Sequence, residues 1–330
     1  MRSITHKTET LRRAVAESRI LADASILKRL MENDVPKKDV LPIARSAGIL
    51  AAKRTSDLIP YCHPILLDWV DIVFEPAANE LVIRVTVEAV AKTGVEMEAL
   101  TAASIAALTV YDMLKPMEAA IEIGKTVLIS KTGGKSDFKE KIPAGFRVEV
   151  LVSSDSTASG RREDKSGKLI LKRLRSYGLE GGYQVVPDDA AMIRETLLQY
   201  CAQGVHLVLT TGGTGLGPRD VMVEATREVI EREVPGIMEA ARSHGQRRTP
   251  YAMLSRGLAG QRGRTLIINF PGSSKGVEES LDAVFPSMLH AFKMMKGLSH
   301  DSIPSSLRAH EVSEAISEHR LLCRPSDSSQ

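Results

Sequence analysis

The most regular pattern in the chain is a helical one, in the stretch 91–115, AKTGVEMEALTAASIAALTVYDMLK. From Glu98 onward this stretch contains neither Pro nor Gly, and its apolar residues recur at helical spacing. One face is formed by Ala103, Ala107, Val110 and Leu114, and the other is largely filled by Ile105 and Leu108. A helix that is apolar nearly all round is expected to lie buried in a core.

Around this helix, apolar and polar residues alternate in a way that predicts strands. We expect strands at Trp69–Phe74, Glu80–Ala89 and Ile121–Ser130, and a helix at Asp39–Arg54. Thr55–Pro64 contains two prolines and is predicted to be a loop. For Met1–Asp34 the pattern fits a capped helix and a strand over Ala14–Leu21 equally well. The first half is therefore predicted to be α+β, with helices packed on an antiparallel sheet.

Lys131–Gly145, KTGGKSDFKEKIPAG, interrupts this pattern with Gly, Pro and Lys, which predicts a domain boundary. Beyond it, strands and helices alternate, as is typical of a mostly parallel sheet covered on both faces. The predicted strands are Phe146–Ser153, Tyr183–Val186, Val205–Thr210 and Thr265–Phe270, and the predicted helices are Gly167–Tyr177, Ala190–Ala202, Val221–Arg232 and Lys275–Lys296. We expect domains at 1–140 and 141–298, followed by a mobile polar tail at 299–330.

Length and composition narrow the class of protein. A chain of 330 residues is long for one core, so two domains are expected. A net charge of only +3 and an aromatic content of 4% argue against a nucleic-acid partner. With no apolar run near twenty residues and no leader-like start, we expect a cytoplasmic protein without a membrane partner. Cys62, Cys201 and Cys323 are isolated, which fits a reducing compartment and gives no support for a metal–thiolate site.

The long helix carries charged residues at both ends, which suggests chemistry. Asp112 and Lys115 are three residues apart and share a face. They form either an ion pair on a solvated helix end or a buried acid that an ammonium keeps ionised for a substrate. Glu98 lies fourteen residues before Asp112, about 21 Å along a helix axis. Either there are two sites or a neighbouring subunit completes one, and we take the second as a hypothesis.

Further candidates precede this helix. Tyr61, Cys62 and His63 end a proline-flanked loop that follows the basic residue Lys53. A lone histidine is more often structural than functional, but this position favours phosphate binding. Lys37, Lys53 and Lys115 are either the cations of one pocket or simply solvated lysines.

Three segments of the first half, AAKRTSDLIPYCHP, KTGVEMEALTAASIAALTVYDMLK and SKTGGKS, closely resemble the cyclic pyranopterin monophosphate synthase family, MoaC, over roughly residues 5–138. The resemblance implies a ferredoxin-like fold and a hexamer built from dimers with intersubunit active sites. It also implies a lyase that converts 3′,8-cyclo-7,8-dihydro-GTP to cyclic pyranopterin monophosphate and diphosphate. The family usually begins with a longer segment containing Asp-Val-Ser, which this sequence does not show.

The resemblance also implies roles for individual residues. Asp112 matches the acid/base of the family and Lys115 its partner. Lys37 matches a second catalytic lysine, although Lys38 makes that alignment ambiguous by one position. The residues that fall on substrate-binding segments are Tyr61, Cys62, His63, Glu96, Met97 and Glu98, with Lys53 as a further cation.

In the second half, two predicted strands run into polar segments, VVPDD and TTGGTG. A glycine-rich loop after a buried strand lets backbone N–H groups approach an anion at a helix start. Asp188 follows one strand, where open parallel sheets place their sites. Asp220 lies just before a helix, where it either caps the helix or holds Mg²⁺.

SSDSTASGRREDKSG, VVPDD, LTTGGTGLGPRD, LSR and INFPGSSKGV resemble the MogA/MoaB family of molybdopterin-binding α/β proteins over roughly residues 146–297. The resemblance implies a three-layer α/β fold in which Asp188 and Asp220 serve adenylyl transfer. It implies that the pterin phosphate is bound by Thr211, Gly212, Gly213, Thr214, Gly215, Pro271 and Gly272, with Ser255 and Arg256 beside it. Met222-Val223 stands where the family usually has Thr-Pro, which weakens the case for catalysis more than for binding.

Together these resemblances indicate a bifunctional protein of molybdenum cofactor biosynthesis. The expected partners are the GTP-derived intermediate, molybdopterin and further copies of the chain, with no permanently bound cofactor and with Mg²⁺ and ATP used by the second half. The alternative is a second half that only binds pterin or drives oligomerisation. The two steps are not consecutive, so the fusion does not imply channelling.

Overall fold

The computed structural model describes residues 1–117, 120–134, 137–138, 140 and 142–297. The predicted tail at 299–330 lies outside the described residues. The chain divides into two compact units, one covering Met1–Asp137 and a second that begins at Phe138.

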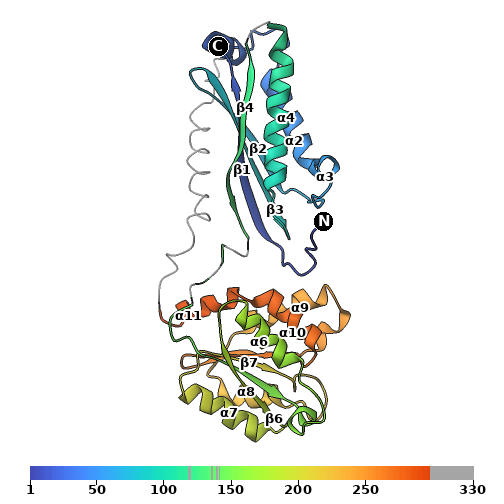
Figure 1. Cartoon of the computed structure of the whole chain (residues 1–330), viewed down its shortest axis with the longest axis vertical. Coiled ribbons are helices and arrows are strands. Elements are labelled where there is room, and N and C mark those ends of the chain that lie inside the picture. Colours follow the sequence, from blue (N-terminus) through green and yellow to red (C-terminus); the bar gives the residue numbers. More distant parts are fainter. Residues whose placement is uncertain (118–119, 135–136, 139, 141, 298–330) are drawn as a thin grey trace, which may run out of the picture. The chain divides into compact units, whose positions relative to one another are not determined.

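The first unit is built on a four-stranded antiparallel sheet of order β2-β3-β1-β4 (Figure 1). Its strands are β1 (Thr10–Leu21), β2 (Trp69–Pro76), β3 (Glu80–Ala91) and β4 (Glu122–Thr132). In β3 every second residue is buried, as the alternation in the sequence predicts. Of the two alternatives for the N-terminal stretch, the strand is confirmed, because β1 runs from Thr10 to Leu21 where the capped helix would have begun. The helix α1 (Ala24–Met31) follows this strand.

Two helices, α2 (Val40–Lys53) and α4 (Glu96–Leu114), pack together over one face of this sheet (Figure 1). Small residues allow the close approach. A Cβ on Gly48 would lie 2.5 Å from Ile72 Cδ1 and 3.1 Å from the carbonyl oxygen of Ala102. The predicted loop at Thr55–Pro64 is partly wrong, because it begins with the one-turn helix α3 (Thr55–Leu58). A 3₁₀ turn, η1 (Lys115–Met117), follows α4.

The expectation that no apolar stretch approaches membrane-spanning length is wrong for one helix. Glu96–Met117 is long enough and, at a mean hydropathy of 1.2, apolar enough to cross a membrane by length and composition. Half of the most apolar part of this helix is buried inside the protein, where α4 contacts β1, β3 and α2. A core helix passes the same test, and the packing identifies α4 as one.

The second unit contains a six-stranded sheet of order β6-β5-β7-β10-β9-β8. Its strands are β5 (Val148–Ser153), β6 (Gly181–Val186), β7 (Leu207–Thr211), β8 (Arg232–Glu233), β9 (Ala259–Arg262) and β10 (Thr265–Phe270). The first four strands in this order are parallel, whereas β9 and β8 are antiparallel to their neighbours. The mostly parallel α/β sheet predicted for this half is confirmed.

Helices cover both faces of this sheet and form two separate cores (Figure 1). One core involves α6 (Ser166–Arg175), α9 (Pro235–Gln246) and α10 (Ser274–Val284), and the other α7 (Ala190–Ala202) and α8 (Met222–Val229). The shorter helical elements are α5 (Asp155–Ala158), η2 (Pro250–Leu254), η3 (Ser287–His290) and α11 (Ala291–Met294).

Three helix predictions need correction here. The closing helix predicted over Lys275–Lys296 is interrupted after Val284, because Pro286 cannot continue a helix and disfavours helical backbone at Phe285. The helix α8 ends at Val229 rather than Arg232, since the chain turns into the edge strand β8. The helix α9 was not predicted.

Candidate functional site

Three of the predicted residues meet at the C-terminal end of α4. Lys115 Nζ lies 2.8 Å from Asp112 Oδ1, and Lys37 Nζ lies 3.0 Å from Asp112 Oδ2. Lys37 also donates to the backbone carbonyl of Asp112 at 3.1 Å. Lys38 instead donates to the carbonyl oxygen of Asn33 at 2.7 Å. The ambiguity of one position between the two lysines is therefore answered by geometry, and Lys37 is the residue that reaches the acid.

This cluster lies on the surface of the chain. The Asp112 side chain is 53% exposed, so a single chain shows the first of the two alternatives, an ion pair on a solvated helix end. Hydrogen bonds from Lys115 and Lys37 lower the pKa of Asp112, and Asp112 raises the pKa of Lys115. The cluster therefore presents an ionised carboxylate between two ammonium groups, an arrangement suited to both proton transfer and anion binding.

The N-terminal end of α4 carries two carboxylates in different surroundings. Glu96 accepts a hydrogen bond from Lys131 Nζ at 3.0 Å, and this contact together with hydrogen bonding to its own backbone outweighs burial and lowers its pKa. Its carboxylate folds over Gly94, where a Cβ would lie 2.0 Å from Oε2. Glu98 is only 4% exposed, and burial raises its pKa. Met97 between them is partly exposed.

The loop that follows α3 belongs to the same end of the unit as Glu98. Burial raises the pKa of the Cys62 thiol, and the charge of Glu98 contributes to this shift. Tyr61 is largely exposed and His63 is half-buried. Lys53 is the last residue of α2 and is exposed.

One chain does not bring all the predicted residues of the first half together. The helix α4 is continuous from Glu96 to Leu114, so the fourteen residues from Glu98 to Asp112 span about 21 Å of its length. Lys37 and Lys115 lie with Asp112, whereas the Glu96–Glu98 segment and Cys62 lie at the other end.

In the second unit, the predicted residues gather at the carboxyl ends of the parallel strands. The chain passes from β5 to β6 on one side and on to β7 on the other, so the strand order reverses between β5 and β7. Such a reversal is where open α/β sheets form ligand crevices.

The glycine-rich loop after β7 lies tightly against its neighbours at this reversal. Gly212 and Gly213 have φ of 92° and 61°, backbone conformations that residues with a side chain rarely adopt. A Cβ on Gly212 would lie 2.1 Å from the carbonyl oxygen of Ser153, and one on Gly272 would lie 3.3 Å from Gly212 Cα. Thr211 Oγ1 donates to the carbonyl oxygen of Pro271 at 2.7 Å. The backbone segments that follow β5, β7 and β10 are therefore in direct contact with one another.

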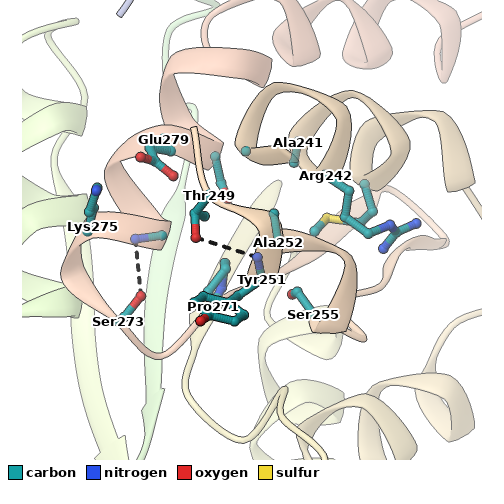
Figure 2. A pocket seen from close by; sticks show the side chains of 14 residues that line it. Ala241, Arg242, Thr249, Tyr251, Ala252, Ser255, Pro271, Ser273, Lys275 and Glu279 are labelled. Carbon is teal, nitrogen blue, oxygen red and sulfur yellow. Dashed lines mark hydrogen bonds between the residues drawn. The ribbon is translucent and has the colours of Figure 1, made fainter. Parts of the chain in front are cut away.

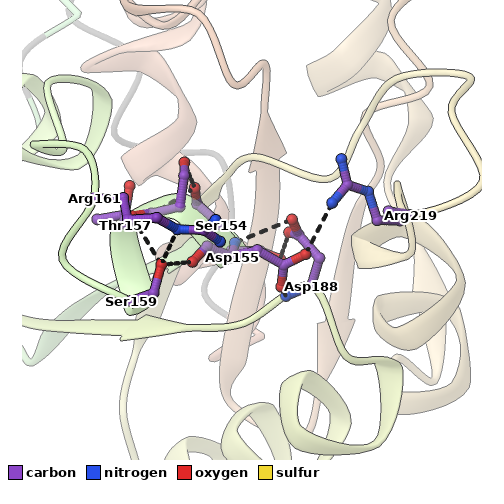
Figure 3. Close-up of polar contacts among 9 residues, drawn as sticks. Ser154, Asp155, Thr157, Ser159, Arg161, Asp188 and Arg219 are labelled. Atoms are coloured by element: carbon purple, nitrogen blue, oxygen red, sulfur yellow. Dashed lines mark hydrogen bonds and ion pairs between the residues drawn. The ribbon is translucent and has the colours of Figure 1, made fainter.

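Asp188 is held in one orientation at this edge (Figure 3). Its Oδ1 accepts from Ser153 Oγ at 2.5 Å, and its Oδ2 accepts from the backbone N–H of Asp155 at 3.2 Å. Asp155 was not predicted as a site residue. Like Asp188, it is the second residue after the end of a strand of the parallel sheet, and that position was the signal that would have found it.

Asp220 does not cap the helix that follows it, contrary to one of the two predictions. Val221 occupies the N-cap position, and Asp220 Oδ2 accepts from the backbone N–H of Gly217 at 2.8 Å. Arg256 holds the same loop from outside by donating to the carbonyl oxygens of Gly215 at 2.6 Å and Asp220 at 2.7 Å. Arg256 also pairs with Glu224. Asp220 is therefore presented by a closed loop.

A cavity of about 300 Å³ lies beside this edge, between α9, η2 and α10 (Figure 2). Its wall includes the predicted residues Ser255 and Pro271. Residues that sequence reasoning missed include Arg242, Thr249, Tyr251 and Lys275. Ser255 Oγ is buried and has no hydrogen-bond partner among the described residues. A hydroxyl of this kind beside a cavity is available to a ligand.

No group of three or more His, Cys, Asp or Glu side chains among the described residues could hold a metal ion. Mg²⁺ is usually bound by one or two carboxylates together with substrate phosphates and water. Asp188 and Asp220 are both partly exposed, so they fit that mode better than a protein-only metal cage.

Comparison with known proteins agrees with this division. The MoaC family model matches residues 1–134, and a model described as a probable molybdopterin binding domain matches residues 149–290. A cyclic pyranopterin monophosphate synthase of Geobacillus kaustophilus (strain HTA426) is 51% identical over 41% of this chain and 86% of its own length. The crystal structure of the molybdopterin biosynthesis enzyme MoaB from Thermus thermophilus matches 46% of this chain and 97% of its own, with 48% identity and a TM-score of 0.43.

Two relatives match nearly the whole chain, and both are described as molybdenum cofactor biosynthesis bifunctional proteins. The one from Chlorobaculum tepidum is 40% identical over 91% of this chain and 96% of its own length. The one from Synechococcus elongatus is 38% identical over 92% of this chain and 99% of its own length. This chain therefore belongs to the family of bifunctional molybdenum cofactor biosynthesis proteins.

Proposed function

We propose that the first unit is a cyclic pyranopterin monophosphate synthase, which converts 3′,8-cyclo-7,8-dihydro-GTP to cyclic pyranopterin monophosphate and diphosphate. The observation that carries this proposal is the Asp112 carboxylate held between Lys37 and Lys115, at 3.0 and 2.8 Å. A triphosphate-derived substrate needs cations, and a ring rearrangement needs a group that moves protons. The relatives that match this unit carry the name of the activity.

We infer that the first unit is ferredoxin-like and that its active site is completed by a second copy of the chain. The strand order β4-β1-β3-β2, with α2 and α4 on one face, supports the fold. The distance between Glu98 and Asp112 along α4 supports the shared site, because one small substrate cannot contact both ends in one chain. A closed homo-oligomer would bring the two ends of different copies together.

We propose that the second unit binds molybdopterin where Thr211, Gly212 and Gly272 line a cavity of about 170 Å³, beside the cavity of about 300 Å³ lined by Ser255 and Pro271, and transfers an adenylyl group to it from Mg-ATP. The predicted phosphate-binding residues in the first cavity and the unpartnered Ser255 hydroxyl in the second support binding. The orientation of Asp188 and the closed loop of Asp220 support a second step at the adjacent edge. Mg²⁺ would be held there by these carboxylates together with phosphate oxygens. We also propose a cytoplasmic location, where the free thiols Cys62 and Cys201 remain reduced.

The first activity is tested with purified protein, the cyclised GTP intermediate and an assay for diphosphate. Asp112→Asn removes the negative charge but keeps the side-chain shape, so it should lower turnover by about 10²- to 10⁴-fold. Molybdopterin binding by the second unit should remain unchanged. Asp34→Asn is the matched control, since Asp34 is an exposed acid of the same unit paired with Arg29. Normal turnover in Asp112→Asn would refute the assignment of the proton-transfer group.

The second activity competes with a non-catalytic alternative, in which this unit only binds pterin or drives oligomerisation. Molybdopterin, ATP and Mg²⁺ are incubated with the whole chain, and the AMP–pterin adduct is measured. AMP transfer supports the enzyme, whereas binding of molybdopterin without transfer supports the carrier. Absence of binding would refute both the enzyme and the carrier, and would leave only the oligomerisation role.

A further inference from the structure

We propose that Asp155 is a positioning residue for Asp188, and that Arg219 couples this pair to the loop that carries Asp220. The proposal rests on the adenylyl-transfer function proposed above. It goes beyond that function by naming two residues that act through others, neither of which was among the predicted site residues.

The first observation is a reciprocal pair of hydrogen bonds (Figure 3). The backbone N–H of Asp188 donates to Asp155 Oδ1 at 3.0 Å, and the backbone N–H of Asp155 donates to Asp188 Oδ2 at 3.2 Å. Because Ser153 Oγ donates to the remaining Asp188 oxygen, both oxygens of that carboxylate are fixed. An ionised carboxylate accepts about four hydrogen bonds, so lone pairs remain for a cation or substrate group.

The second observation is an ion pair across two loops. Arg219 Nη1 lies 3.3 Å from Asp155 Oδ2, so the oxygen of Asp155 that does not hold Asp188 faces a guanidinium. Arg219 directly precedes Asp220, whose carboxylate is held by the backbone N–H of Gly217. A chain of contacts therefore runs from Asp188 through Asp155 and Arg219 to Asp220.

The ion pair in this chain of contacts is suited to orienting groups, since it can add little stability. The Arg219 side chain is 81% exposed, and exposed ion pairs contribute little to folding. Two carboxylates that act on one substrate must keep their separation, and a misplacement of about 1 Å can lower a rate by about 10²-fold. An effect on rate without an effect on stability is therefore the signature that separates a positioning role from a structural one.

The test uses the whole chain and four variants. Asp155→Ala removes both the acceptor for Asp188 and the partner of Arg219. Asp155→Asn keeps an acceptor oxygen but loses the charge that pairs with Arg219, and Arg219→Gln loses the same pair from the other side. The fourth variant combines Asp155→Asn with Arg219→Gln. Glu228→Gln is the control, because Glu228 forms an exposed ion pair with Arg194 in the same unit.

For AMP transfer from Mg-ATP to molybdopterin, we expect Asp155→Ala to lower kcat by about 10- to 100-fold. The Kd for molybdopterin should stay unchanged, and the melting temperature should stay unchanged in Arg219→Gln and fall only by the loss of one hydrogen bond in Asp155→Ala. Asp155→Asn and Arg219→Gln should each lower kcat by a similar, smaller factor, and the double variant should be no worse than either, because both remove one interaction. Normal kcat in Asp155→Ala, a kcat loss in Arg219→Gln that follows a lower melting temperature, or additive losses in the double variant would overturn the proposal.

A second measurement keeps the proposal testable if the wild-type protein transfers no AMP, in which case the proposed enzyme function fails by itself. Hydrogen exchange at the Asp188 amide reports directly on its bond to Asp155. We expect at least about tenfold faster exchange in Asp155→Ala, and little change in Asp155→Asn. Unchanged exchange in Asp155→Ala would refute the positioning role independently of activity.

Discussion

Replacing Gly212 with Ala tests the close packing between the ends of β5, β7 and β10, on which the site of the second unit depends. Two costs are expected. The residue has φ of 92°, and holding a side chain in left-handed backbone costs about 1–2 kcal/mol. The new Cβ would also lie 2.1 Å from the carbonyl oxygen of Ser153, which is backbone and cannot rotate away. Forcing such an overlap costs about 1–3 kcal/mol more, so we expect a total of about 2–5 kcal/mol.

Gly204→Ala is the matched control for this variant. Gly204 has φ of 72°, but no other atom lies within 4 Å of its added Cβ. It should therefore show only the backbone cost of about 1–2 kcal/mol. The difference between the two variants isolates the contact between Gly212 and Ser153.

The assay is hydrogen exchange followed by mass spectrometry on peptides from β5 and β7. Slow exchange in these central strands reports the free energy of unfolding of the second unit separately from the first. We expect a larger loss for Gly212→Ala than for Gly204→Ala, together with weaker molybdopterin binding in Gly212→Ala only. Equal losses of stability and normal binding in both would refute the proposed packing of the loop.

Two further predictions concern the first unit. Lys37→Ala should lower formation of cyclic pyranopterin monophosphate by at least about tenfold, whereas Lys38→Ala should leave it nearly unchanged, because Lys37 contacts Asp112 and Lys38 does not. The reverse order of the two losses in a diphosphate-release assay would contradict the geometry. Glu98→Gln should raise the melting temperature at pH 7. Burial raises the folded-state pKa of Glu98 above its ordinary value of about 4.3, so at pH 7 the ionised carboxylate is more stable in the unfolded chain and lowers the free energy of unfolding. The neutral Gln side chain removes this cost. The gain in melting temperature should disappear as the pH falls below about 4.3, where Glu98 is protonated in both the folded and the unfolded state. Unfolding of this unit is followed by the fluorescence of Trp69, the single tryptophan. A gain that persists at low pH would show that the charge of Glu98 does not cause it.

Periodicity located the elements whose burial is regular. The predicted helix Ala190–Ala202 and strand Thr265–Phe270 have the bounds that the structure gives them. The strand β10 reads directly from the sequence because all six of its residues are buried between two helix layers. By contrast, β1 was undecided, because Arg and Glu side chains interrupt its apolar pattern, and two of them, Arg13 and Glu17, find partners on the neighbouring strand β3. The helix α9 was missed because a run of small and polar residues hides its apolar face.

The candidate sites show the same division. The sequence alone indicated the charged ends of the long helix, the glycine-rich loop and the aspartates after strands, since each is a local pattern of residue types. Only the tertiary structure decided that Lys37 rather than Lys38 reaches Asp112, and that Asp220 closes its own loop instead of capping a helix. The structure also brought Asp155 against Asp188, which lies more than thirty residues away in the chain. Local patterns follow from the spacing of neighbouring residues, but contacts between distant residues depend on how strands and helices pack, and spacing does not encode that.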